Sequence, residues 1–575
     1  MMSRISLRRL ALVSTIASLI SAAAIIACSS QTTVGENVAT TSAPLTVGTN
    51  HDVTGSLHLM HETSVVSASY GLDGQLVSHW VVGFNNCVPD NLQGCQNVDT
   101  IAGWATSSDV TGLVWTAHTQ TAGGDFGTPG ELGARSQPTA GGTFAGWRGD
   151  PSLAVVTDPA LSNGGRRVIY ANIGNSSLHP SSDIVVALSD TGGETWGHAQ
   201  FANEPTNGGS WANSQHTVWD GVDEPKLASN RSAPYGTYVA WVTGSGAYIN
   251  KISYANDFAV SLGMPVWGQA VKIPPAQLGG QDLPIWHPTL IPFTHTSCKD
   301  ATPHEALYVV WADGGMGRCP ENVDSGSRME LSTTWHSVIY DTLDGWSGPW
   351  TLEADSAWPN CVGFPITNGN GRVSSNLSNP AIAYDYLSET FWVAHTQGTA
   401  YGTRVSVLPQ SFVCQGGTLV PTTGPGVAWR PSTPCYNTAG CTPGGPNGAD
   451  GGIVVNDEWG PAMAFMLDET TVPPTSRLIV TWYDTRFDIG NRLVQVWGTE
   501  SRDDGISFDA PVTVSKPGTG QTIPWDHTLA GWWDYQSIGI DKVNGRFLDA
   551  WGGDARLGAP SLPTCVRQLP RRSLV

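Results

Sequence analysis

The sequence carries little charge, and little of the positive sign in particular. Charged residues make up 13% of the chain, and 28 Lys and Arg stand against 48 Asp and Glu, a formal net charge of -20. Such a chain repels phosphate backbones, so we expect no nucleic-acid partner. Long apolar runs are absent after residue 27. The chain is rich instead in Gly (67), Pro (38) and Trp (24), which is typical of short strands joined by many turns.

Cysteine is scarce, and its spacing excludes the common zinc and redox motifs. Besides Cys28, the chain holds Cys87, Cys95, Cys298, Cys319, Cys361, Cys414, Cys435, Cys441 and Cys565. Cys87 with Cys95, and Cys435 with Cys441, are close enough in sequence to form local disulfides. The odd number of cysteines leaves at least one thiol over, and the remaining pairing stays open.

The N-terminus has the pattern of a secretion signal. Three arginines, Arg4, Arg8 and Arg9, precede an uncharged apolar run over residues 10–27. A run of about 18 apolar residues would also suffice for an uncleaved anchor helix. The end of the run, Ile25-Ile26-Ala27-Cys28, resembles the lipobox of bacterial lipoproteins. That resemblance implies removal of residues 1–27 and lipidation of Cys28.

The residues after Cys28 indicate where the protein is located and how its body is connected to the lipid. Ser29 stands where an Asp often retains lipoproteins on the inner membrane, so we expect an outer-membrane or cell-surface protein, with the periplasmic face as the alternative. Residues 28–50 are small and polar, and we expect them to form a flexible tether.

One sequence pattern occurs in seven copies in the rest of the chain. A polar residue, often before Pro, begins an apolar strand, and a second strand then ends in an aromatic and a polar residue. The first strands begin at Glu62, Asp150, Glu224, His287, Asn379, Glu458 and Asp534. Spacings of about 60 to 90 residues suit a four-stranded blade with variable loops.

We therefore expect an all-β fold, a single β-propeller over residues 51–575. Seven four-stranded blades are predicted, with six blades and an accessory piece as the alternative. The last copy has room for about three strands. Residues 43–47 could supply its fourth strand, so that the N-terminus closes the ring.

Short turn motifs support this fold. Residues 501–508 read Ser-x-Asp-x-Gly-x-Ser-Phe, in which Ser501 and Asp503 satisfy turn amides, Gly505 takes a conformation that other residues resist, and Phe508 packs on the blade. A second copy keeps Ser189, Gly193 and Trp196 but has Thr191 in place of Asp. Degenerate copies lie at residues 107–115 and 341–350.

These motifs resemble the Asp boxes of the sialidase-like superfamily of BNR-repeat β-propellers. The resemblance covers nearly all of the mature chain, and each box falls where the third and fourth strands of a blade should turn. It implies the fold, but Asp boxes are shared by hydrolases, lyases and binding proteins, so it leaves the activity open.

Strand pairing predicts where a site would lie. The start of a first strand faces the end of a second strand at one rim, which we call the axial rim, while the Asp boxes face the opposite rim. Converging carboxylates with His, Tyr and Arg could bind a sugar there, or cleave it. The catalytic candidates are Asp150, Glu458, Asp534 and Tyr535. The substrate-binding candidates are Glu224, His287, His395, Asp484, Arg486, Arg556 and Arg318.

The resemblance to exo-sialidases implies roles for some of these residues. Three arginines would hold a sialic acid carboxylate, Tyr535 with Glu458 would form the nucleophile pair, and Asp150 would be the acid. The F-R-I-P phrase that usually begins such chains is absent. Acidic residues at blade starts also serve a structural purpose elsewhere, because they cap strand amides around the axis.

Two classes of function are compatible with the sequence. The first is a noncatalytic surface propeller, a monomer, that binds an extracellular glycan or protein at its acidic axial rim and contacts the membrane only through its lipid. The second is a carbohydrate-active enzyme, a glycoside hydrolase or a polysaccharide lyase. No cofactor is expected. Calcium among the carboxylates is an alternative that no EF-hand-like loop supports.

Overall fold

The structure is a computed structural model. It describes residues 50–52, 59–68, 70–72, 75–77, 79–87, 100–108, 114–118, 144–157, 166–176, 183–189, 191–194, 196, 200–202, 222–229, 236–244, 246–253, 266–267, 270–313, 334–340, 345–352, 379–399, 402–422, 458–468, 474–484, 493–515, 525–526, 536–541, 545–552 and 564–569. Within this part of the chain, no helix has the length and apolarity that a bilayer span requires.

The described residues form seven antiparallel sheets of four or five strands, which we number as blades 1 to 7. Blade 1 holds β2 (Leu59–Ser67), β5 (Trp80–Cys87), β6 (Thr100–Ser107) and β7 (Thr116–His118). Blade 2 holds β8 (Phe144–Thr157), β9 (Arg166–Ser176), β10 (Asp183–Ser189) and β11 (Gln200–Phe201). Blade 3 holds β12 (Asp223–Ser229), β13 (Thr237–Thr243), β14 (Gly246–Ser253), β15 (Val266–Trp267) and β16 (Val271–Lys272).

The remaining blades follow the same order. Blade 4 holds β19 (Trp286–Thr296), β20 (Pro303–Ala312), β21 (Thr334–Tyr340) and β22 (Gly345–Thr351). Blade 5 holds β23 (Ala381–Asp385), β24 (Thr390–Thr399), β25 (Gly402–Gln415) and β26 (Thr418–Thr422). Blade 6 holds β27 (Glu458–Asp468), β28 (Thr475–Asp484), β29 (Leu493–Ser501), β30 (Val512–Thr513) and β31 (Trp525–Asp526). Blade 7 holds β32 (Ser537–Asp541), β33 (Arg546–Gly552), β34 (Thr564–Leu569) and β1 (Asn50–Asp52).

Two short hairpins accompany the blades. They are β3 (Tyr70–Leu72) with β4 (Gln75–Val77), and β17 (Gln277–Leu278) with β18 (Gln281–Asp282).

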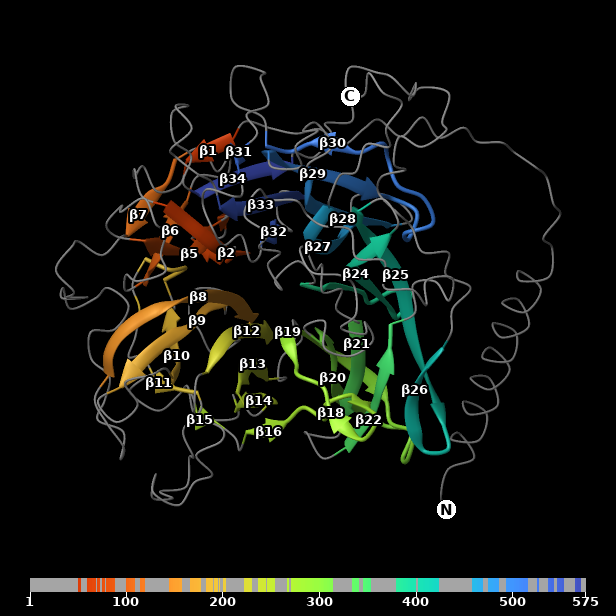
Figure 1. Ribbon diagram of the computed structural model, residues 1–575. Helices are drawn as coiled ribbons and strands as arrows, with labels where there is room; N and C mark the ends of the chain where they lie inside the picture. Colours follow the sequence, from red (N-terminus) through yellow and green to blue (C-terminus); the bar gives the residue numbers. More distant parts are fainter. Residues whose placement is uncertain are drawn as a thin grey trace, which may run out of the picture. The chain divides into compact units, whose positions relative to one another are not determined.

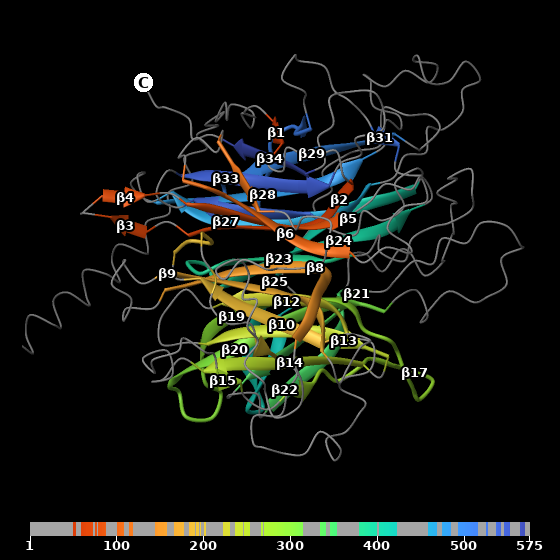
Figure 2. The ribbon, with the colours of Figure 1, turned by 90° about the vertical axis from the view of Figure 1, so that its left-hand side faces the viewer.

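The blades form a closed ring around their first strands. Each first strand contacts the next, in the order β2, β8, β12, β19, β23, β27 and β32, and β32 contacts β2 again. Figure 1 shows this inner circle of first strands. In Figure 2, blades 1, 2 and 3 follow one another down the side that faces the viewer. The predicted all-β propeller is confirmed, and the described residues contribute seven sheets of four or five strands to it.

The N-terminal strand completes the last blade, as predicted. β1 pairs with β34, with Asn50 opposite Arg567 and Asp52 opposite Cys565. The segment expected to do this, residues 43–47, lies outside the described residues. The structure assigns the closing strand to Asn50–Asp52 instead, because this segment is the one in register with β34.

The apolar core lies in layers between neighbouring blades. The second strands are buried along nearly their whole length, because a blade covers each of their faces. Five of them carry a fully buried tryptophan: Trp80, Trp241, Trp311, Trp482 and Trp551. No single blade can bury both of its faces alone, so each blade depends on its neighbours for burial.

The Asp boxes lie where the sequence predicts, between third and fourth strands. Gly505 N–H donates to Ser501 Oγ at 2.9 Å, and Ser507 N–H donates to Asp503 Oδ1 at 2.9 Å. In blade 2, Gly193 N–H donates to Ser189 Oγ at 2.8 Å in the same way. There the hydroxyl of Thr191, 3.2 Å from Ser189 Oγ, replaces the missing carboxylate.

These boxes also hold neighbouring blades together, which the sequence did not indicate. Trp104 of blade 1 donates from Nε1 to the carbonyl of Gly193 in blade 2 at 3.0 Å. The box aromatic Trp196 meets Trp104 edge-on, with ring centroids 6.1 Å apart. In blade 6, the backbone of Gly505 lies against the indole of Trp392 from blade 5.

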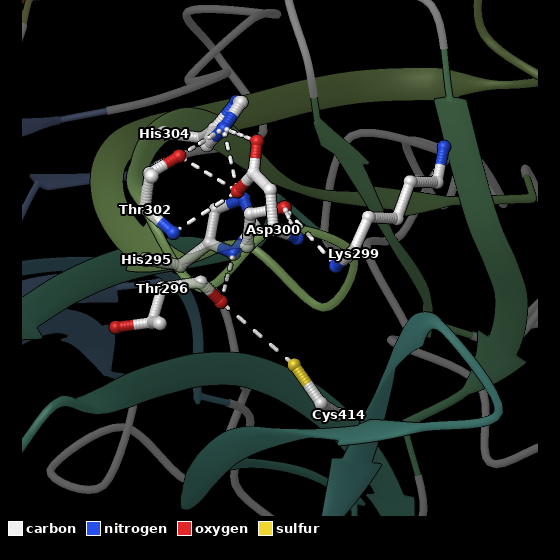
Figure 3. A network of polar contacts seen from close by, with 8 residues as sticks. His295, Thr296, Lys299, Asp300, Thr302, His304 and Cys414 are labelled. Atoms are coloured by element: carbon white, nitrogen blue, oxygen red, sulfur yellow. Dashed lines mark hydrogen bonds and ion pairs between the residues drawn. The ribbon is translucent and has the colours of Figure 1, made fainter.

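One disulfide joins blades 4 and 5 among the described residues. Cys298, in the turn between β19 and β20, bonds Cys414 at the end of β25, with Cα atoms 5.3 Å apart. Figure 3 shows Cys414 below this turn, with its Sγ 3.8 Å from the carbonyl oxygen of Thr296. Of the two local pairs considered, Cys435 with Cys441 and the partner Cys95 of Cys87 lie outside the described residues.

We predict that the glycine of the blade 6 Asp box is essential for ring stability. Gly505 has φ of 73°, and an added Cβ would overlap the ring of Trp392. Gly505→Ala should lower the free energy of unfolding by about 3 kcal/mol, from backbone strain and overpacking together. Equilibrium unfolding in urea measures this.

The matched control is Gly416→Ala, in the β25–β26 turn. Its φ of 62° is similar, but no atom lies within 4 Å of an added Cβ. This variant should lose about 1 kcal/mol, the cost of the backbone alone. Equal losses in the two variants would show that the contact with Trp392 does not matter.

Candidate functional site

The strand register brings the described candidate residues to one rim. The start of each first strand pairs with the end of the second strand, as Glu458 does with Asp484 and His61 with Asn85. The Asp box in blade 6 follows Ser501, which pairs with Leu478 near the start of β28, and so lies at the opposite rim. The register therefore defines the axial rim.

A β-bulge interrupts the first strand at this rim in five blades. The register shifts after His61, Gly149, Asp223, Trp286 and Trp459. In four of the five, the next residue has positive φ and precedes Pro, a residue that has no N–H to leave unpaired. These residues are Asp150 (φ 60°), Glu224 (φ 51°), His287 (φ 50°) and Gly460 (φ 56°).

Three of these bulge residues are not glycine, which costs about 1 to 3 kcal/mol each unless neighbours compensate. Side chains of the adjoining blades supply that compensation. Asp150 N–H donates to Asn85 Oδ1 at 2.8 Å, and Glu224 N–H donates to Asp150 Oδ2 at 3.3 Å. His287 N–H donates to Glu224 Oε2 at 2.8 Å.

The result is a chain of hydrogen bonds across blades 1 to 4. In blades 2, 3 and 4, the bulge amide is held by a side chain of the preceding blade. Glu224 also holds the His287 ring, with Oε1 2.8 Å from Nδ1. Both side chains are buried, with exposed fractions of 7% for Glu224 and 1% for His287. Glu224 and His287 were predicted to contact a substrate. In the structure, their buried side chains contact each other and join blades 3 and 4.

Asp150 has a second acidic neighbour, Asp223. Burial, then the nearby Asp150 carboxylate, raises the pKa of Asp223 well above its usual range, although the Glu224 N–H donates to Asp223 Oδ1 at 3.0 Å. Two carboxyl groups this close cannot both ionise without a large cost. We therefore expect the pair to share one proton at neutral pH. Both side chains remain partly exposed.

Four other rim residues make contacts within their own blade or with the preceding blade. Asp313 Oδ2 accepts from Trp335 Nε1 at 3.1 Å, and Asp484 Oδ2 accepts from Trp482 Nε1 at 3.1 Å. His395 Nδ1 lies 3.2 Å from Thr334 Oγ1. Glu458, a catalytic candidate, is fully buried and accepts from Val405 N–H at 3.2 Å.

The structure thus brings Asp150, Glu224 and His287 together on blades 2 to 4. It places Glu458 and Asp484 on blade 6, and His395 on blade 5, and all three side chains are buried. The remaining candidates, Asp534, Tyr535, Arg318, Arg486 and Arg556, lie outside the described residues. The sialidase arrangement that depends on them stays a prediction.

Two rim residues were missed as site candidates. Asp223 and Trp286 occupy the position just before the bulge residue in blades 3 and 4. The repeated pattern of a polar residue before Pro locates this position in the sequence. It does not show which side chains of the neighbouring blade lie against it. Within the described chain, no group of three or more His, Cys, Asp or Glu side chains is arranged to hold a metal ion.

Comparisons with known proteins give distant likenesses only. No protein-family model matches the sequence, and no curated protein matches it. An α-L-arabinanase of Penicillium chrysogenum aligns with a TM-score of 0.35 and 10% identity over 91% of this chain and 98% of its own. A GH93 α-L-arabinofuranosidase of Fusarium graminearum, in complex with arabinobiose, aligns with a TM-score of 0.39 and 12% identity over 79% and 98%.

A Hadza microbial sialidase aligns with a TM-score of 0.36 and 10% identity over 93% of this chain and 96% of its own. Likenesses at this level carry no argument about what this chain binds or cleaves, so the site must be interpreted from its own geometry.

The shared proton of the acidic pair predicts a pH dependence of stability. Asp223 keeps its proton in the folded chain but loses it near pH 4 in the unfolded chain. The free energy of unfolding should therefore fall as pH rises above about 4. Asp223→Asn removes this slope, so relative to wild type it should gain up to about 1.4 kcal/mol per pH unit.

Urea unfolding between about pH 5 and pH 8 measures the difference. The control is Asp300→Asn, in the turn shown in Figure 3, where hydrogen bonds from Thr302 lower the pKa of an exposed carboxyl. Asp300 is ionised in both states over this range, so its variant should keep the wild-type slope. Parallel curves for wild type and Asp223→Asn would refute a shared proton.

Proposed function

We propose that this propeller binds a glycan at the axial rim of blades 2 and 3. The observation that carries the proposal is the acidic pair of Asp150 and Asp223. A pair with one proton offers an O–H donor and several acceptor oxygens at one place. Sugar hydroxyls donate and accept hydrogen bonds, so such a pair can satisfy them in both directions.

The surroundings of the pair favour a fixed binding site. Asp150 is held by Asn85 on one side and by the Glu224 amide on the other. Preorganised polar groups lose little side-chain entropy when a ligand binds. Among the described residues, Glu458 and Asp484 of blade 6 are buried, whereas Asp150 and Asp223 are partly exposed at the rim.

A second candidate function is glycoside hydrolysis at the same pair. The raised pKa of Asp223 is what a general acid needs to protonate a leaving oxygen near neutral pH. Asp150 would then stay ionised beside it and stabilise positive charge on the sugar. This mechanism assigns different roles to two carboxyl groups, which their environments separate.

Two variants should distinguish binding from hydrolysis. Asp150→Asn removes the charged acceptor and should weaken glycan binding about tenfold or more, since a hydrogen bond to a charged group contributes about 1.5 to 3 kcal/mol. Asp223→Asn keeps a donor but cannot release a proton, so it should stop any sugar release while binding persists. Retention on a glycan panel and released sugar are measured together.

Asp300→Asn, in an exposed turn near the opposite rim, is the control and should match wild type. Glycan retention without release by wild type would overturn the hydrolase function. Binding that is unaffected by Asp150→Asn would overturn the placement of the site. Release of sialic acid would point instead to the arginines outside the described residues.

We also propose that the protein is exported and anchored by a lipid on Cys28. Its N-terminal pattern supports this, and so does the disulfide between Cys298 and Cys414, since structural disulfides persist in oxidising compartments. The tether over residues 28–50 and the address at the outer membrane or cell surface belong to the same proposal.

Substitution of Cys28 tests the anchor. In a bacterial host, the wild-type chain should fractionate with membranes, with a mature mass that includes the acyl chains. Cys28→Ser should lose the acylated mass and accumulate as uncleaved precursor. Cys414→Ser, which has no part in the anchor, should behave as wild type in fractionation. Wild type that carries residues 1–27 and no lipid would indicate an anchor helix instead.

A further inference from the structure

Trp286 is unusual among the tryptophans of this protein. Most of those with described side chains are buried in the layers between blades, whereas Trp286 is 37% exposed, more than any other described tryptophan. It lies at the axial rim, as the first residue of β19, just before the left-handed His287. Its indole therefore offers an apolar surface at a rim that is otherwise rich in polar side chains.

The tryptophan at the equivalent position in blade 6 is buried instead. Trp459 also precedes the bulge, pairs with Tyr483 and is buried against it, with ring centroids 5.8 Å apart. Trp286 pairs instead with Ala312, whose methyl group cannot cover an indole. The exposure of Trp286 thus follows from a small residue on the opposite strand.

Trp286 lies one blade further along the rim than Asp223, and hydrogen bonds connect the two positions through His287 and Glu224. His287, the next residue, is fixed by two contacts of 2.8 Å with Glu224. Glu224 in turn donates its N–H to Asp223 and Asp150. Asp223 and Trp286 occupy equivalent positions in adjacent blades, so an aromatic surface and a proton-sharing pair flank one short stretch of the rim.

We infer that Trp286 is a stacking platform for the apolar face of a pyranose ring, and that it makes the axial rim specific for neutral glycans. A pyranose has C–H groups on one face and hydroxyls around its edge, so it can use an aromatic ring and a carboxyl pair at once. The rim carboxylates of Asp150, Glu224 and Asp313 disfavour sugars that carry a carboxylate. The inference rests on the proposed function, because it assigns the ligand of the same site.

Titration with uncharged gluco-, manno- and galacto-oligosaccharides, and with a sialylated one, tests the platform. Trp286→Ala in the full chain should weaken binding of the best neutral glycan about tenfold, because aromatic stacking contributes about 1.5 kcal/mol or less. Trp286→Phe keeps an aromatic face and should lose less than about threefold. Calorimetry reports affinity, and thermal unfolding reports that each variant is folded.

Ile506→Ala is the matched control. Ile506 is an apolar side chain 83% exposed in the Asp box at the opposite rim, so its removal should leave glycan affinity unchanged. Wild-type affinity in Trp286→Ala, together with weakened binding in Asp150→Asn, would overturn the platform and leave the proposed function standing. Binding of the sialylated glycan alone would overturn the neutral specificity. No binding of any glycan by wild type would overturn the proposed function itself.

Discussion

Apolar contact between neighbouring blades is the constraint on which the rest of this structure depends. A second strand such as β20 is buried on both faces, and only the two adjoining blades can bury it. The Asp boxes act within this constraint, because Gly193 and Gly505 lie directly against side chains of the preceding blade. Each of these turns thus fills space between its own blade and the preceding blade. The axial rim inherits its rigidity from the same packing.

The same residues of the axial rim both join neighbouring blades and lie at the proposed binding site. Asp150 and Glu224 adopt left-handed backbone conformations, and each holds the bulge amide of the next blade. Such residues are fixed by structure, yet Asp150 keeps part of its surface open beside Asp223. A site built in this way needs no separate scaffold, because the groups that join the blades also position the polar groups that a ligand would meet.

Local chemistry explains why the fold could be predicted from the sequence. The Asp box needs only the side chains of Ser501 and Asp503 and the backbone conformation of Gly505, and the repeat marks the two ends of each first hairpin. Features that depend on distant partners could not be predicted. Cys298 and Cys414 are 116 residues apart and meet only because blades 4 and 5 adjoin. Trp286 and Trp459 look alike in sequence, and only Ala312 or Tyr483 on the neighbouring strand decides which one is exposed.

The closing strand has a consequence for how the chain is made. β1 is among the first segments of the body to be synthesised, yet its partner β34 is among the last. Long-range pairing of this kind slows folding, since the intervening chain must be ordered before the pair forms. Blade 7 cannot be completed while β34 is still missing, so the first strand of the propeller waits unpaired until nearly the whole chain has emerged. Exposed strand edges invite wrong pairing, and this interval is when the chain most needs protection.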